Sequence, residues 1–152
     1  MTLYLDTSSL VKLYVEEPGS EAVRRLVAAA TIVATSLVAY PEARAAFARR
    51  RREGVLRPSA FAAARRSLDA DWPHYLAIGV SARLCREAGE LAERYRLRGY
   101  DAVHLASFAE LARSAGARDT RFSSFDDRLN RAAGALRRTL SRVGQAASGK
   151  SS

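Results

Sequence analysis

The chain has 152 residues, of which 48% are hydrophobic and 27% charged, the size and composition of one globular domain rather than a disordered or fibrous chain. Lys and Arg number 25 and Asp and Glu 16, so the formal net charge is +9, and nearly all of the positive charge is arginine. This balance favours a polyanion, either nucleic acid or an acidic protein surface, as a partner.

Several classes of protein are excluded by the same composition. Cys85 is the single cysteine, which excludes an intrachain disulfide and a cysteine-based zinc site. No apolar stretch approaches the roughly 20 residues that span a bilayer. The first residues lack a basic segment and reach a carboxylate at Asp6, so we expect no signal peptide and no membrane partner. A cytoplasmic location is the expectation.

Apolar and β-branched runs predict four strands, over residues 3–5, 31–35, 74–80 and 121–123. Periodic apolar positions between them predict helices over 10–14, 20–30, 41–52, 58–72, 82–95, 100–115 and 128–133. Strands that alternate with helices indicate a mostly parallel sheet with helices on both faces. With no repeat and no linker, we expect one domain over residues 1–143.

Capping residues and breakers locate several helix ends. Ser20 and Ser81 are predicted N-caps, and Pro41 fits a first helical position with Glu42 in that first turn. Residues 136–143 contain three arginines and favour either an edge strand or a helix. Residues 144–152 are small and polar, and we expect a flexible tail there.

Four carboxylates fall where ligands collect in open α/β sheets, beyond the carboxyl ends of the strands. Asp6, Glu42 and Asp126 follow predicted strands, and Asp101 lies at the start of a predicted helix. Carboxylates that share one pocket repel each other by several kcal/mol at low effective dielectric, so either some are protonated or a cation neutralises them. Mg²⁺ and Mn²⁺ prefer such oxygen ligands.

A simpler structural interpretation exists for each of these residues. Asp6, Asp101 and Asp126 are also suitable helix N-caps, and Glu42 also complements a helix dipole. His104 lies three residues after Asp101 on the same helical face, where it either packs in the core or reaches the pocket. If the acids do converge, a bound cation would activate water and stabilise a phosphodiester, which in a basic protein fits a nuclease.

Four segments in order also resemble PIN-domain proteins, and most closely the VapC-type toxins of toxin–antitoxin pairs. They are residues 3–14 (LYLDTSSLVKLY), 35–42 (TSLVAYPE), 99–106 (GYDAVHLA) and 123–129 (SSFDDRL). The resemblance runs from residue 3 to about residue 133. It implies a three-layer α/β/α sandwich around a parallel sheet of four to five strands.

The resemblance also implies Mg²⁺- or Mn²⁺-dependent cleavage of RNA, with the acidic roles at Asp6, Glu42, Asp101 and Asp126. Asp126 is preferred over Asp127 because the family places this acid two residues after a Ser or Thr, here Ser124. Thr7 and Ser124 would support the metal ligands through hydrogen bonds. Family members commonly dimerise and are inhibited by a small antitoxin of the VapB type.

Two other functions remain open at this point: a PIN-domain nuclease of RNA processing that is not a toxin, and a non-catalytic RNA- or protein-binding module. The arginine run Arg49, Arg50, Arg51 and Arg52 is either a solvated helix end or a contact for RNA or the antitoxin. Family members usually end in an apolar fifth strand, for which residues 136–143 are the single candidate.

Overall fold

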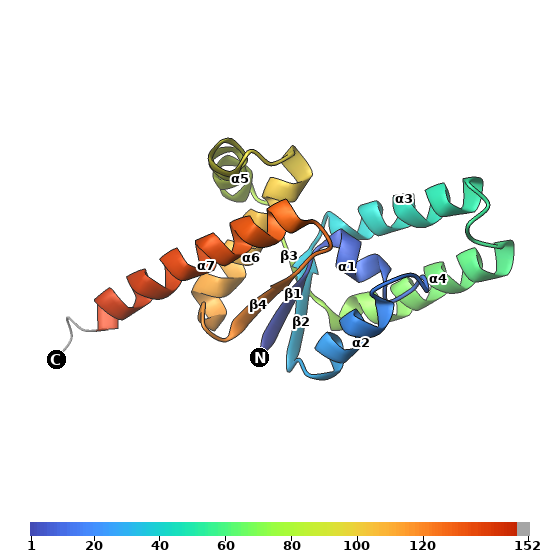
Figure 1. Ribbon diagram of the computed structural model, residues 1–152, viewed down its shortest axis with the longest axis horizontal. Helices are drawn as coiled ribbons and strands as arrows, with labels where there is room; N and C mark the ends of the chain where they lie inside the picture. Colours follow the sequence, from blue (N-terminus) through green and yellow to red (C-terminus); the bar gives the residue numbers. More distant parts are fainter. Residues whose placement is uncertain (149–152) are drawn as a thin grey trace.

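A four-stranded parallel sheet forms the centre of the protein (Figure 1). The computed structural model describes the backbone of residues 1–148 and the side chains of residues 1–143. The strands are β1 (Thr2–Leu5), β2 (Ile32–Ser36), β3 (Leu76–Ile78) and β4 (Thr120–Ser123), in the order β3-β2-β1-β4. The helices are α1 (Thr7–Val11), α2 (Ser20–Ala28), α3 (Ala39–Arg52), α4 (Pro58–Asp71), the 3₁₀ turn η1 (Trp72–His74), α5 (Ala82–Tyr95), α6 (Gly99–Ala115) and α7 (Asp127–Ser148).

The helices cover both faces of the sheet, which confirms the predicted α/β/α sandwich (Figure 1). Alternate residues of β1 point to opposite faces, as the period of a strand requires. Leu3 and Leu5 pack into a core with α1, α2, α3 and α4, whereas Tyr4 packs into a second core with α5, α6 and α7. None of the helices within residues 1–148 combines the length and the apolar character that a membrane span needs.

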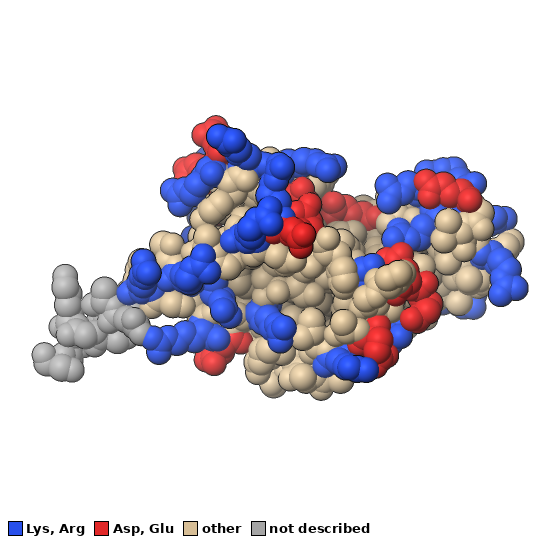
Figure 2. All heavy atoms as spheres, viewed as in Figure 1, with Lys and Arg blue, Asp and Glu red and all other residues tan. Residues whose placement is uncertain are grey.

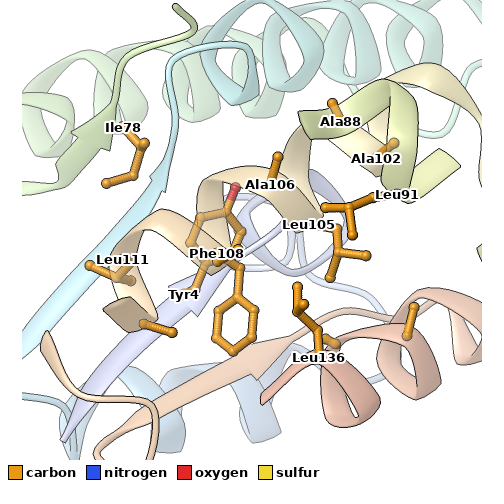
Figure 3. Packing of buried hydrophobic residues seen from close by; sticks show 14 of the residues in the cluster. Tyr4, Ile78, Ala88, Leu91, Ala102, Leu105, Ala106, Phe108, Leu111 and Leu136 are labelled. Atoms are coloured by element: carbon orange, nitrogen blue, oxygen red, sulfur yellow. The ribbon is translucent and has the colours of Figure 1, made fainter. Parts of the chain in front are cut away.

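An aromatic cluster anchors the second core beside β1 (Figure 3). The ring of Tyr4 stacks on Phe122 with 5.4 Å between centroids, and Phe108 meets Phe122 edge to face at 5.1 Å. Because Tyr4 is fully buried, its hydroxyl needs a polar partner inside the protein. That partner is His104 of α6, and this contact connects the core to the acidic residues described below.

Of the two predicted N-caps, Ser81 is confirmed and Ser20 is wrong. The Ser81 hydroxyl accepts a hydrogen bond from the backbone N–H of Leu84 at 3.1 Å. The N-cap of α2 is instead Gly19, whose φ of 94° is left-handed, and the buried Ser20 hydroxyl donates to the carbonyl of Val15. Ser20 therefore stabilises the turn before the helix rather than the helix end.

We expect Ser81→Ala to destabilise the protein by about 1 kcal/mol, because α5 loses the side-chain acceptor at its N-terminus. Ser81→Asp, which supplies another acceptor, is expected to stay within a few tenths of a kcal/mol of the wild type. Chemical denaturation of the three proteins measures the difference. Equal stability of Ser81→Ala and the wild type would show that the cap has no energetic role.

Several predicted boundaries need correction. The strand predicted over 74–80 is only three residues long, because Pro73 lies in η1 and the chain is extended only from Tyr75 onward. Helix α3 begins at Ala39, before Pro41. The proline still lies within the first turn, where its missing N–H removes no hydrogen bond.

The C-terminal segment is one continuous helix rather than a short helix and a strand. Apolar residues recur at helical spacing along it and pack on the core formed with α5 and α6, namely Leu129, Leu136 and Leu140. Of the two structures predicted for residues 136–143, the helix is therefore confirmed. Within residues 1–148 the sheet therefore has four strands, which agrees with the four to five that the resemblance implied, and residues 136–143 do not add a fifth. Residues 144–148 of the expected tail continue α7, and residues 149–152 lie outside the described residues.

The strand order predicts where a ligand site lies, at the carboxyl ends of β1 and β4. The chain runs from β1 through β2 to β3 in one direction and then returns to place β4 on the other side of β1. In open α/β sheets, ligands bind outside the carboxyl ends of the strands where the direction reverses. Asp6 directly follows β1, and Ser124 directly follows β4.

Candidate active site

Asp6 is a buried carboxylate held by three donors at the end of β1. Its side chain is N-cap of α1, and Oδ1 accepts from the backbone N–H of Ser9 at 2.9 Å and from the hydroxyl of Ser8 at 2.7 Å. The Ser124 hydroxyl donates to Oδ2 at 2.6 Å. The residue is 5% exposed, so these bonds determine the orientation of the carboxylate.

Ser124 connects Asp6 to Asp126 across the crevice. Its hydroxyl oxygen, which donates to Asp6, also accepts from the backbone N–H of Asp126 at 3.0 Å. Asp126 in turn caps α7, because its Oδ1 accepts from the backbone N–H of Leu129 at 2.9 Å. The capping interpretation therefore holds for both aspartates, and it positions them at the same crevice.

Glu42 lies in the first turn of α3 and is connected to α1 and α6 by hydrogen bonds. The Thr7 hydroxyl donates to its Oε2, and Nε2 of His104 lies 2.8 Å from the same oxygen. The other ring nitrogen of His104, Nδ1, lies 2.9 Å from the buried hydroxyl of Tyr4. Burial alone would raise the pKa of Glu42, but the hydrogen bonds from His104 and Thr7 outweigh it and lower the pKa.

Asp101 projects from the first turn of α6 and differs from the other acids. No hydrogen bond within residues 1–143 engages its carboxylate. Burial raises the pKa of Asp101, and the charges of Asp126 and Asp6 raise it further, partly offset by Arg98. Asp101 lines one cleft with Asp126, which Ser124 connects to Asp6. Figure 2 shows acidic atoms in the middle of the visible face, bordered by basic atoms.

The acids do not form a ready-made metal cage. Within residues 1–148, no three His, Cys, Asp or Glu side chains converge as a metal-binding cluster. Instead, hydroxyl and backbone amide groups donate hydrogen bonds to Asp6, Glu42 and Asp126. The donor set nevertheless fits a hard divalent cation, because it consists of carboxylate oxygens with no thiolate, and such ions retain several water ligands.

The arginine run lies away from these acids. Arg49–Arg52 form the last turn of α3, whereas Glu42 lies in its first, which is about 10–15 Å along the helix axis (Figure 1). Arg50 forms an ion pair with the half-buried Glu17 at 2.9 Å and so holds α3 on the α1–α2 loop. Contact of the four arginines with RNA or the antitoxin stays a prediction.

His104, Tyr4 and Ser8 complete the site and were not assigned to it from the sequence. The spacing of Asp101 and His104 did place both on one face of α6. The contact of His104 with Tyr4, 100 residues earlier, depends on the packing of α6 on β1 and leaves no local signal. Ser8 bonds to Asp6 only because the chain turns into α1 at that point.

A parallel sheet between two helical layers is the fold that the resemblance to PIN-domain proteins implied, and the chain belongs to that family. The PIN domain family model matches residues 3–135. The chain is 39% identical over 105 residues to ribonuclease VapC45 of Mycobacterium tuberculosis, a match that covers 69% of this chain and 73% of that protein. It is 34% identical over 134 residues to ribonuclease VapC46 of the same species, covering 88% and 92%.

Proposed function

We propose that the protein is a divalent-metal-dependent endoribonuclease that hydrolyses RNA phosphodiester bonds. The observation that carries the proposal is that Asp101 and Asp126 line one cleft, and that Ser124 connects Asp126 to Asp6, in a member of the PIN family. The relatives named ribonuclease VapC support RNA as the substrate. The excess of positive charge, +9 overall, supports a polyanionic substrate.

Asp6, Glu42, Asp101 and Asp126 would hold the ion, which we propose to be Mg²⁺ or Mn²⁺. When bound, such a cation supplies Lewis-acid chemistry that activates water and stabilises charge on a phosphate. The remaining residues orient the acids. Ser124 holds Asp6 and Asp126 together, and the hydrogen bonds of Thr7 and His104 fix the orientation of Glu42 and lower its pKa.

The same relatives support a role as the toxin of a type II toxin–antitoxin pair in the cytoplasm. The partner would be a VapB-type antitoxin that covers the crevice, and the toxin would form a homodimer. Induced expression is expected to arrest growth, and Asp101→Asn is expected to relieve the arrest. Normal growth at high levels of soluble wild-type protein would favour the alternative of an RNA-processing nuclease.

Metal removal tests the enzymatic proposal directly. We expect purified protein to cut RNA with Mg²⁺ or Mn²⁺, to stop in excess EDTA, and to recover when the metal is restored, because the carboxylates cannot activate water without a cation. Products on a denaturing gel measure the reaction. Equal cleavage in EDTA would contradict the proposal, and cleavage that survives Asp101→Asn would indicate a contaminating nuclease.

A further inference from the structure

A second feature adjoins the carboxylates: a cleft whose lining includes four arginines and three aspartates. The cleft has a volume of about 430 Å³ and lies between the α5–α6 turn and the start of α7. Its basic residues are Arg96, Arg98, Arg128 and Arg131. Asp101 and Asp126 line the same cleft, so it is continuous with the proposed active site.

The backbone around the cleft presents these arginines from three elements. Arg96 ends α5 in a left-handed conformation, with φ 54° and ψ 47°, and is the only non-glycine residue with positive φ in the described part of the chain. Its carbonyl accepts a hydrogen bond from Nη1 of Arg128 at 3.1 Å, which fixes the turn to α7. Arg131 follows Arg128 by three residues and so lies on the same face of α7.

The arginines of the cleft differ from those that form ion pairs elsewhere on the protein. Arg24, Arg25, Arg44, Arg50, Arg83 and Arg113 each form a salt bridge. Within residues 1–143, none of the four arginines of the cleft does so, although aspartates line it with them. Apart from Nη1 of Arg128, which bonds to the carbonyl of Arg96, their donors therefore remain available to an anion from outside, and a planar fork of donors suits phosphate.

We propose that this arginine cleft binds a backbone phosphate of the RNA substrate, next to the phosphate that is cut. The proposal rests on the proposed ribonuclease function and assigns a substrate subsite to it. A nucleic acid fits better than an acidic peptide because the ring of Phe125, which is 48% exposed, also lines the cleft; the Lys12 ammonium covers one face of this ring, 4.3 Å from its centroid, and leaves the rest for a base. Arginine beside an exposed aromatic ring can hold a phosphate and stack a base at once.

The first test compares RNA binding by the wild type, a variant of the cleft and a control variant. It is done in EDTA, where cleavage does not interfere. We expect the double variant Arg98→Gln/Arg131→Gln to bind a short oligoribonucleotide about tenfold more weakly than the wild type. The slope of log K against log salt should fall by about 0.7 for each phosphate that the variant no longer neutralises. The charge-matched control, Arg66→Gln/Arg118→Gln, replaces exposed arginines on α4 and on the loop before β4, and is expected to bind as the wild type does.

Arg96→Gly separates binding from folding. Glycine adopts the left-handed conformation without a steric penalty, so this variant should melt at the same temperature as the wild type or higher, while RNA binding weakens. If Arg96→Gly binds RNA with wild-type affinity, its side chain is not part of the subsite.

A neutral methylphosphonate placed at each linkage of the RNA in turn locates the contact. We expect wild-type binding to weaken at one linkage beside the cut, and the Arg98→Gln/Arg131→Gln variant to be insensitive at that linkage alone. A merely structural role of the arginines would leave every linkage as sensitive as in the wild type, and this result would overturn the subsite.

The outcomes distinguish the two proposals. A wild-type protein that neither binds nor cuts RNA contradicts the proposed function itself. A wild-type enzyme that cuts RNA, with cleft variants equal to the control, overturns the subsite alone. Loss of polyglutamate binding together with unchanged RNA binding in the cleft variants would assign the cleft to an acidic peptide and would also overturn the proposal.

Discussion

Asp101→Asn is expected to lower RNA cleavage by about 10³-fold or more while leaving the fold at least as stable as in the wild type. The loss follows because the amide cannot supply a charged ligand to the cation, and an electrostatic contribution of this kind to the transition state accounts for about 10²–10³ in rate by itself. The unchanged fold follows because no hydrogen bond within residues 1–143 depends on the Asp101 carboxylate.

The two halves of this prediction are measured separately. Initial rates of cleavage give the activity, and thermal melts give the stability. Glu93→Gln, which neutralises an exposed acid on α5, is the matched control and should retain wild-type activity. A variant that loses cleavage and also unfolds would point to misfolding instead, and full activity in Asp101→Asn would remove this residue from the mechanism.

The raised pKa of Asp101 predicts that the difference in stability between the wild type and Asp101→Asn depends on pH. Because burial and the charges of Asp126 and Asp6 raise this pKa in the folded protein, ionisation of Asp101 opposes folding. The wild type should therefore lose stability relative to Asp101→Asn as the pH rises through the unfolded-state value of about 3.9, and the gap should be complete above the raised folded-state pKa. Melts of both proteins from acidic to neutral pH test the sign, and a gap that closes with rising pH would contradict it.

His104→Ala is expected to destabilise the protein by about 3 kcal/mol, because it leaves buried polar groups without partners. The imidazole is 2% exposed and lies between the Tyr4 hydroxyl and Glu42. Its removal leaves a cavity beside β1, an unpaired hydroxyl and a carboxylate whose pKa is no longer held low by the ring. Cleavage should fall as well, since Glu42 loses its orientation.

The other histidine provides the control for this second prediction. His74 is exposed in η1, and His74→Ala should change the free energy of unfolding by no more than about 0.5 kcal/mol. In a double-mutant cycle, Tyr4→Phe should cost less in the His104→Ala background than in the wild type, because the hydroxyl has already lost its partner. Additive losses would show that Tyr4 and His104 do not interact.

The acids were predictable from the sequence because each follows a local signal. A parallel sheet brings the carboxyl ends of its strands to one edge, so Asp6 and Asp126 meet there although they are distant along the chain. Capping was the alternative interpretation of these residues, and the structure shows it for Asp6 and Asp126. The same two carboxylates that begin α1 and α7 also face the crevice.

Other features depend on tertiary contacts that no local pattern encodes. Ser20 has the right residue type for an N-cap, but its hydroxyl bonds to Val15 because the preceding loop folds back. Residues 136–143 suit a strand or a helix, and the packing of Leu136 and Leu140 on the core decides for the helix. The arginine cleft joins the α5–α6 turn to α7, so its members are scattered among the many arginines of the sequence.

Crystals grown with Mn²⁺ and measured at an anomalous wavelength would test most directly whether these acids bind one divalent ion. We predict an anomalous peak in the crevice between β1 and β4, with carboxylate oxygens of Asp6 and Asp101 about 2 Å away, a normal ligand distance for a small divalent cation. Well-ordered crystals with saturating Mn²⁺ and no peak near those two carboxylates would contradict the proposed metal site.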